Sequence, residues 1–105
     1  MIRIYVGEDD EYDEDPLYHA IVKKLHDLGI KGCTVNRGIE GYGRASKIHR
    51  AKTFVVSGDL PITIISTDED DKIRAVLPEI AAMLKDGMIN LIPVEVIEVH
   101  GGKLV

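Results

Sequence analysis

The chain opens with the stretch IRIYVG, residues 2–7, in which apolar side chains alternate with polar or amphipathic ones. That period of two predicts a β-strand that ends at Gly7. The apolar residues that follow are three or four positions apart, which predicts an amphipathic helix. Asp15 is placed as the N-cap of this helix, Pro16 as its first residue and Gly29 as its C-terminal stop.

Strand-like segments recur after the first helix. They are expected over residues 33–37, over 53–56 together with 60–66, and over 89–99. Thr67 is predicted to open a second helix, with Asp70 in a capping-box position and Gly87 at the end. Pro78 lies inside that helix, so a kink or two abutting segments are expected there. The order βαββαβ predicts a single α+β domain over residues 1–105 with a ferredoxin-like fold, in which two helices cover one face of a four-stranded antiparallel sheet.

The second face of that sheet has no helix left to cover it, because two helices can cover only one face. The adjacent apolar pairs Ile64–Ile65, Leu91–Ile92 and Val96–Ile97 place side chains on both faces of a strand. An exposed apolar face of that size is unusual for a monomer, so we expect it to be buried in an oligomer. Scattered surface aliphatic residues are the alternative.

The composition is that of an ordinary globular domain. The chain has 105 residues and a mass of 11.6 kDa, with 45% hydrophobic and 30% charged residues. The net charge of −5 conceals two opposite segments: seven of the 18 acids lie in residues 8–15, and five Lys and Arg lie in residues 37–52. A duplex-binding protein usually carries a whole basic face, so nucleic acid is not expected as a partner.

The sequence also bounds the expected location. No apolar run approaches the roughly 20 residues that span a bilayer, and no secretory signal is visible at the N-terminus. Cys33 is the single cysteine, so an internal disulfide is impossible. We expect a cytoplasmic protein without membrane insertion.

A glycine-rich stretch, GIEGYGR at residues 38–44, is the strongest candidate for a binding site. Glycines permit positive φ angles and a close approach of backbone N–H groups, and Arg44 at the rim suits a phosphate. The spacing is neither a dinucleotide fingerprint nor a Walker A loop. A simple turn is the alternative role for these glycines.

The longer segment GCTVNRGIEGYG, residues 32–43, resembles PII-like proteins, an uncharacterised family (a domain of unknown function) related to PII nitrogen-regulatory signal-transduction proteins. That family carries Gly-x-Thr-Val-x-Arg-Gly-Ile-Glu-Gly-Tyr/Phe-Gly, and every fixed position is filled here. Other recurring features match at residues 6–8, 16–18, 59–61 and 93–96. The resemblance implies a ferredoxin-like subunit, a homotrimer whose sheets face a common axis, and adenine nucleotides bound in clefts between subunits.

The resemblance also implies which residues bind the nucleotide. They are Thr34, Gly41, Tyr42, Gly43 and Arg44 at the base of the loop after the second strand, and Gly87 and Met88 in the turn before the last strand. Met88 stands where PII has a phosphate-binding lysine, and Glu98 and His100 stand where it has two arginines. Fewer charge-assisted hydrogen bonds then remain for a triphosphate, so AMP or ADP is expected to be favoured over ATP.

The sequence therefore predicts a signalling or regulatory protein, not an enzyme, with no required cofactor. The loop of residues 44–52 is expected to report the bound nucleotide to an unknown protein partner. One alternative is a small enzyme acting on a phosphorylated or nucleotide substrate, with His49 or His100 as the acid–base group. Another alternative is a divalent-metal-responsive trimer of the cation-tolerance type. The four histidines, His19 and His26 among them, lack the short spacing of metal ligands. The acidic residues 8–15 lack the pattern of an EF-hand calcium loop.

Overall fold

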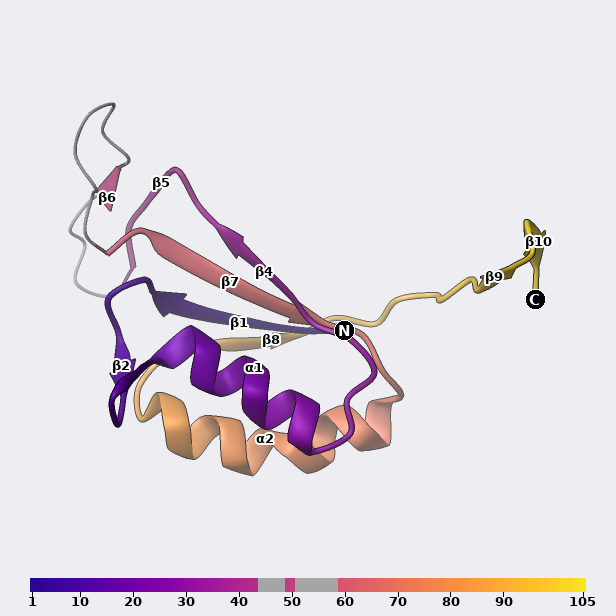
Figure 1. The fold of residues 1–105 in the computed structure, drawn as a ribbon, viewed down its shortest axis with the longest axis horizontal. Helices are drawn as coiled ribbons and strands as arrows, with labels where there is room; N and C mark the ends of the chain where they lie inside the picture. Colours follow the sequence, from indigo (N-terminus) through magenta and orange to yellow (C-terminus); the bar gives the residue numbers. More distant parts are fainter. Residues whose placement is uncertain (44–48, 51–58) are drawn as a thin grey trace.

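The computed structural model describes residues 1–43, 49–50 and 59–105, without the side chains of residues 49–50. Four strands form one antiparallel sheet in the order β4-β7-β1-β8 (Figure 1). Their bounds are Ile2–Gly7 for β1, Thr34–Arg37 for β4, Pro61–Ser66 for β7 and Ile89–Leu91 for β8. Helices α1 (Leu17–Asp27) and α2 (Asp70–Leu84) lie side by side on one face of this sheet. The arrangement is compatible with the expected ferredoxin-like fold.

The hydrophobic core lies between the two helices and the sheet. β1 and β7 alternate buried and half-buried residues, as their period of two predicts. The helices contribute the apolar stripes expected from their 3.6-residue period. The fully buried side chains are Ile2, Ile4, Ile21, Leu25, Ile64 and Ile80.

The start of α1 differs from the expected one. Asp15 is not an N-cap, because Asp15–Pro16 forms strand β3, which pairs with β2 (Glu11–Tyr12) in a small hairpin. The helix begins at Leu17, whose N–H donates to the carbonyl of Asp10 at 2.7 Å. Pairing within the acidic segment therefore replaces the cap that the sequence suggested.

The end of α1 is the one the sequence predicts. Gly29 adopts a φ of +83°, in the left-handed region where glycine is favoured. Its N–H donates to the carbonyl of His26 at 3.1 Å, and the N–H of Ile30 donates to that of Leu25 at 3.0 Å. These two bonds form a Schellman motif, and Ile30 is buried beneath it.

Helix α2 begins at Asp70, with Glu69 as its N-cap, two residues later than the predicted capping box with Thr67 as N-cap requires. Asp68 instead accepts hydrogen bonds from the backbone N–H groups of Glu69 and Lys31, at 2.8 and 3.0 Å. The helix runs through Pro78 as one element rather than two abutting segments. Buried residues on both sides of Pro78 explain its continuity, because packing of the apolar stripe outweighs the loss of about 3 kcal/mol that an internal proline causes.

The last strand is much shorter than expected. β8 stops at Leu91, after which Ile92 exchanges two backbone hydrogen bonds of 2.8 Å with Met1. Pro93 has no N–H to continue the ladder. Residues 93–105, called the C-terminal arm below, project away from the sheet and helices (Figure 1) and end in a hairpin of β9 (Val99–His100) and β10 (Lys103–Leu104).

The arm makes the molecule longer than a typical domain of this size. The Cα radius of gyration is 15.4 Å, whereas a compact domain of this length has about 13 Å. The arm also holds six of the large apolar side chains that are exposed: Val94, Val96, Ile97, Val99, Leu104 and Val105. Exposed apolar surface is therefore concentrated on the arm.

The sheet face opposite the helices is largely polar, so the expected apolar second face is wrong. This open face carries Arg3, Tyr5, Thr34, Asn36, Thr63, Ile65 and Asn90. Of the three apolar pairs, Ile64–Ile65 lies within a strand and places one side chain on each face. Leu91 pairs with Ile2 on the helix face, and residues 96–97 lie in the arm.

Candidate functional site

The sheet has two ends, and the predicted site residues are divided between them. At the loop end, β1 and β4 finish near Gly7 and Arg37, and β7 and β8 begin. The arm end is the opposite one, where β4 begins and β8 leads into the arm. Gly41, Tyr42, Gly43, Gly87 and Met88 belong to segments at the loop end (Figure 1). Thr34 starts β4 at the arm end, so the structure does not bring it near the glycines, and Arg44 lies outside the described residues.

The residues at the loop end occupy two different edges of the sheet. Gly41 lies in β5 (Glu40–Gly41), which follows the edge strand β4 and pairs with β6 (His49–Arg50). Gly87 and Met88 precede the other edge strand, β8. The central strands β7 and β1 lie between these edges, which separates them by about 14 Å at the usual interstrand spacing. One chain thus presents two half-sites, one on each edge.

The glycines on the β4 side owe their small size to packing. A Cβ atom on Gly38 would lie 2.7 Å from Cγ of Pro61, and one on Gly41 would lie 3.1 Å from the same atom. The N–H of Gly38 donates to the carbonyl of Pro61 at 2.7 Å. Neither these two glycines nor Gly43 adopts a left-handed φ, so the expected positive φ angles are wrong for all three.

Tyr42 and Gly43 have more freedom to meet a ligand. The side chain of Tyr42 is 72% exposed, and a Cβ atom on Gly43 would meet no atom within 4 Å. An exposed aromatic ring is a stacking surface for a base. Residues 42–43 therefore offer an exposed ring beside a backbone with open space, although Ile39 in the same segment is exposed as well.

The second half-site is a tight turn between α2 and β8. Lys85 has φ +64° and ψ −65°, and the N–H of Asp86 donates to the carbonyl of Leu84 at 2.8 Å, which defines a γ-turn. Met88 is 58% exposed. Sequence reasoning missed Lys85 as an exposed cation beside this half-site, because it reads as an ordinary residue of the helix end.

Two carboxylates fix the backbone near the loop end. Glu8 forms an ion pair with Arg37 and is largely buried, so it joins the end of β1 to the end of β4. Asp10 accepts a hydrogen bond from the N–H of Gly7 at 2.8 Å. The acidic segment is thus partly hydrogen-bonded, and no cluster of three or more His, Cys, Asp or Glu suited to a metal ion is found among the described residues.

Two histidines of the alternative functions, His26 and His100, lie in different parts of the molecule. His26 is on α1, and its Nδ1 lies 3.6 Å from Oδ1 of Asp27. His100 is in the arm, and its Nε2 lies 3.4 Å from Oε2 of Glu98. The arm leaves the sheet at the end opposite Gly87, so Glu98 and His100 are remote from the half-sites of their own chain. The side chain of His49 is outside the described part of the chain.

Cys33 lies just before β4, in a groove of about 350 Å³ at the arm end. Burial raises the pKa of its thiol, and the neighbouring Ser66 partly opposes that rise. A raised thiol pKa disfavours the thiolate, so this cysteine is a poor nucleophile.

Searches against known proteins find a family without an assigned function. Residues 1–96 match the model of DUF190, described as "Uncharacterized ACR, COG1993". A UPF0166 protein of Aquifex aeolicus is 35% identical over 97 residues, covering 92% of this chain and 91% of the relative. The UPF0166 protein MJ1524 of Methanocaldococcus jannaschii is 33% identical over 92 residues, covering 88% and 84%.

Within the described residues, no helix is long and apolar enough to cross a membrane. The relation to PII proteins stays a prediction, whereas the predicted membership of an uncharacterised family is confirmed. The chain belongs to the DUF190 family.

Proposed function

We propose that this protein is a PII-like regulatory protein that binds AMP or ADP in clefts between neighbouring copies of a homotrimer. The observation that supports this most directly is the division of the candidate site. The β4–β5 segment and the α2–β8 turn lie at the same end of the sheet but on opposite edges. A nucleotide that contacts both must therefore lie between two chains, with the β4 edge of one beside the β8 edge of the next.

Each half-site offers a different part of the recognition. Tyr42 supplies an exposed aromatic ring for the adenine base. Lys85 supplies one cation for the phosphate, beside Met88. A site with a single described cation suits a monophosphate or diphosphate better than a triphosphate, because each further phosphate adds charge that is left without a partner.

Signalling would pass through the loop that follows the first half-site. Residues 44–52 begin directly after Tyr42 and Gly43, so a bound nucleotide would bias the conformations that this loop presents to a protein partner. A cytoplasmic location belongs to the same proposal, because an exposed free thiol at Cys33 suits a reducing compartment.

Calorimetric titration with AMP, ADP, ATP and divalent metal ions tests the proposal. We expect AMP or ADP to bind at least as tightly as ATP, and metal ions alone to give no saturable heat. Tyr42→Ala should weaken AMP binding by roughly 5- to 150-fold, the range for loss of one stacked base. Leu28→Ala, which removes an exposed apolar side chain at the C-terminal end of α1, towards the arm end of the molecule, is the control.

A mixing experiment tests whether the cleft lies between chains. Tyr42→Ala and Lys85→Glu each damage a different half-site. If the cleft joins two chains, a randomly mixed trimer regains about a quarter of its clefts with both halves intact. Mixed samples that bind no better than either variant alone would place both halves in one chain, and absence of any nucleotide binding by the unmodified protein would remove the proposed function.

A further inference from the structure

Arg3 is a cation whose Nε atom finds no hydrogen-bond acceptor among the described residues. The residue lies on β1, on the open face of the sheet, between Ile65 of β7 and Asn90 of β8. The Nε atom is also shielded from solvent, so bulk water does not satisfy it. Buried donors in folded proteins almost always have an acceptor, which makes this nitrogen a candidate for an external one.

The side chains around Arg3 are polar but uncharged. The amide nitrogen of Asn90 donates to the hydroxyl of Tyr5 at 3.1 Å, which leaves the hydroxyl proton for another acceptor. Thr34 of β4 and Thr63 of β7 add further hydroxyls to the same face. The strand residues of this face include no Asp or Glu to balance the guanidinium. The open face therefore has a positive charge and hydrogen-bond donors but no acid.

The placement of copies in the proposed function would enclose this face. Three chains that each set their β4 edge beside the β8 edge of the next close into a ring. Helices α1 and α2 cover only one face of each sheet (Figure 1), and this thicker layer fits on the outside of the ring, where there is more room. The open faces then point inward. Because β1 is an inner strand of each sheet, the three Arg3 side chains converge on the middle of the ring rather than on a seam between copies.

Three converging guanidinium groups repel one another. The repulsion is stronger inside a ring than on a surface, because less water screens it there. An anion at the centre replaces this repulsion by attraction. The planar guanidinium fork fits the oxygens of phosphate, sulfate or carboxylate groups, and each such hydrogen bond is charge-assisted. An anion with two or three negative charges matches three cations better than chloride does, since chloride has a single charge and no oxygens for the fork.

We propose that the open faces of three copies together hold one multiply charged oxyanion between their Arg3 side chains. This rests on the ring of copies in the proposed function, but it uses neither Tyr42 nor Lys85 and requires no nucleotide. The site is therefore separate from the nucleotide clefts. It takes one anion per three chains, whereas the clefts take one nucleotide per chain, so stoichiometry distinguishes the two.

Calorimetric titration in a chloride buffer tests the proposal, with inorganic phosphate, sulfate and citrate as the probes. We expect saturable binding at one anion per three chains, and the tightest probe tells a mineral oxyanion from a polycarboxylate. Arg3→Gln should weaken this binding by about tenfold or more, because a hydrogen bond to a charged group is lost in each copy. Arg3→Lys should recover only part of the binding, since a point charge replaces the fork.

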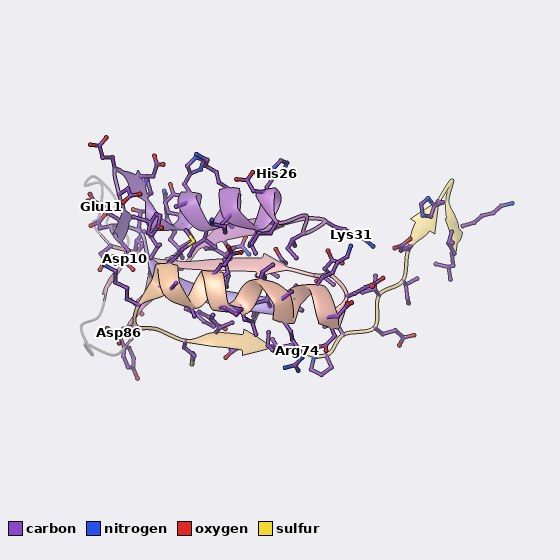
Figure 2. The ribbon with its side chains drawn as sticks, turned by 90° about the horizontal axis from the view of Figure 1, so that it is seen from below. Asp10, Glu11, His26, Lys31, Arg74 and Asp86 are labelled. Carbon is purple, nitrogen blue, oxygen red and sulfur yellow. The ribbon has the colours of Figure 1, made fainter. Side chains whose placement is uncertain are left out.

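Arg74→Gln is the matched control. Arg74 lies on α2, near the end of the molecule from which the arm leaves (Figure 2), and its Nε atom lies 2.9 and 3.1 Å from the two carboxylate oxygens of Asp70. This arginine already has an acceptor within the helix layer, so its loss should leave phosphate binding unchanged. Thermal unfolding gives a second readout: phosphate should raise the melting temperature of the unmodified protein and of Arg74→Gln, but not that of Arg3→Gln.

Binding of one anion per chain, equal weakening by Arg3→Gln and Arg74→Gln, or no saturable binding of any probe would each overturn the proposal. Phosphate that AMP displaces and that Lys85→Glu weakens would lie in the nucleotide cleft, which also overturns it. Titration of the same preparations with AMP keeps the two proposals apart. One anion per three chains without AMP binding retains the anion site and removes the nucleotide, whereas AMP binding without any bound anion removes the anion site alone.

Discussion

Adding one methyl group at Gly38 should destabilise the protein, because Pro61 already occupies the space. A Cβ atom there would lie 2.7 Å from Cγ of Pro61, whereas carbon atoms in contact are normally about 3.5–4.0 Å apart. The ring cannot withdraw freely, since the carbonyl of Pro61 accepts the Gly38 N–H at 2.7 Å and β7 pairs with β1 at that residue. Overpacking of this kind costs about 1–3 kcal/mol.

Gly32→Ala is the matched comparison for this substitution. Gly32 also lacks a left-handed φ, and a Cβ atom on it would meet nothing within 4 Å. Both alanines lower the conformational entropy of the unfolded chain, and this effect stabilises each variant equally, by about 0.4–1 kcal/mol. That contribution cancels, so the difference between the two variants isolates the clash, about 1–3 kcal/mol.

Thermal unfolding at one protein concentration measures the difference. A gap of about 1–3 kcal/mol corresponds to melting temperatures about 4–20 °C apart for a domain of this size. Pro61→Ala in the Gly38→Ala background should recover part of the loss, since neighbouring substitutions couple by about 0.5–3 kcal/mol. Equal melting temperatures for Gly38→Ala and Gly32→Ala would refute the packing role and return Gly38 to the ligand-binding candidates.

Three further predictions concern the nucleotide, the core and the pH dependence. Met88→Lys should shift the ratio of ATP to AMP affinity towards ATP by about 1.5–3 kcal/mol if the ammonium reaches a phosphate. Calorimetric titration measures this ratio, and an unchanged ratio would remove Met88 from the site. Ile80→Ala should lower the free energy of unfolding by about 2–5 kcal/mol, because the Ile80 side chain is fully buried. Denaturant unfolding measures this loss, and a value below about 1 kcal/mol would contradict the place of Ile80 in the core. Hydrogen bonds from backbone N–H groups, of which that from Glu69 has the largest effect, lower the pKa of the Asp68 carboxyl below its ordinary 3.8. The ionised carboxylate therefore stabilises the fold above that pH. This stabilisation is lost as the pH falls through the lowered pKa. The stability gap between the protein and Asp68→Asn should therefore shrink in acid, and a gap independent of pH would contradict this.

The sequence predicted the elements whose signals are local. β1, β4 and the end of α1 at Gly29 follow from side-chain period and from glycine at a helix stop. The start of α1 was wrong because Asp15 has two local uses, as a cap or in a hairpin, and pairing with Tyr12 selects the second. No pattern in the segment itself distinguishes these two uses.

The longer-range errors share one cause. The apolar residues of the arm alternate as a strand does, but alternation does not say whether the partner strand belongs to the same chain. The apolar surface that suggested association is real, yet it lies on the arm rather than on the open face of the sheet. The division of the site residues between two edges was equally hidden, because it depends on strand order and not on spacing.

The positions of β1 in the chain and in the sheet have a consequence during synthesis. β1 (Ile2–Gly7) precedes both of its neighbours in the chain, because β7 starts at Pro61 and β8 at Ile89. Non-local pairing of this kind folds slowly, and β1 must wait as an unpaired, β-prone segment. Arg3 is its single charged residue, and it lies on the open face, where it takes no part in the core. A charged residue within an exposed apolar strand opposes aggregation, so Arg3 would act against association of the nascent chain until the partner strands emerge.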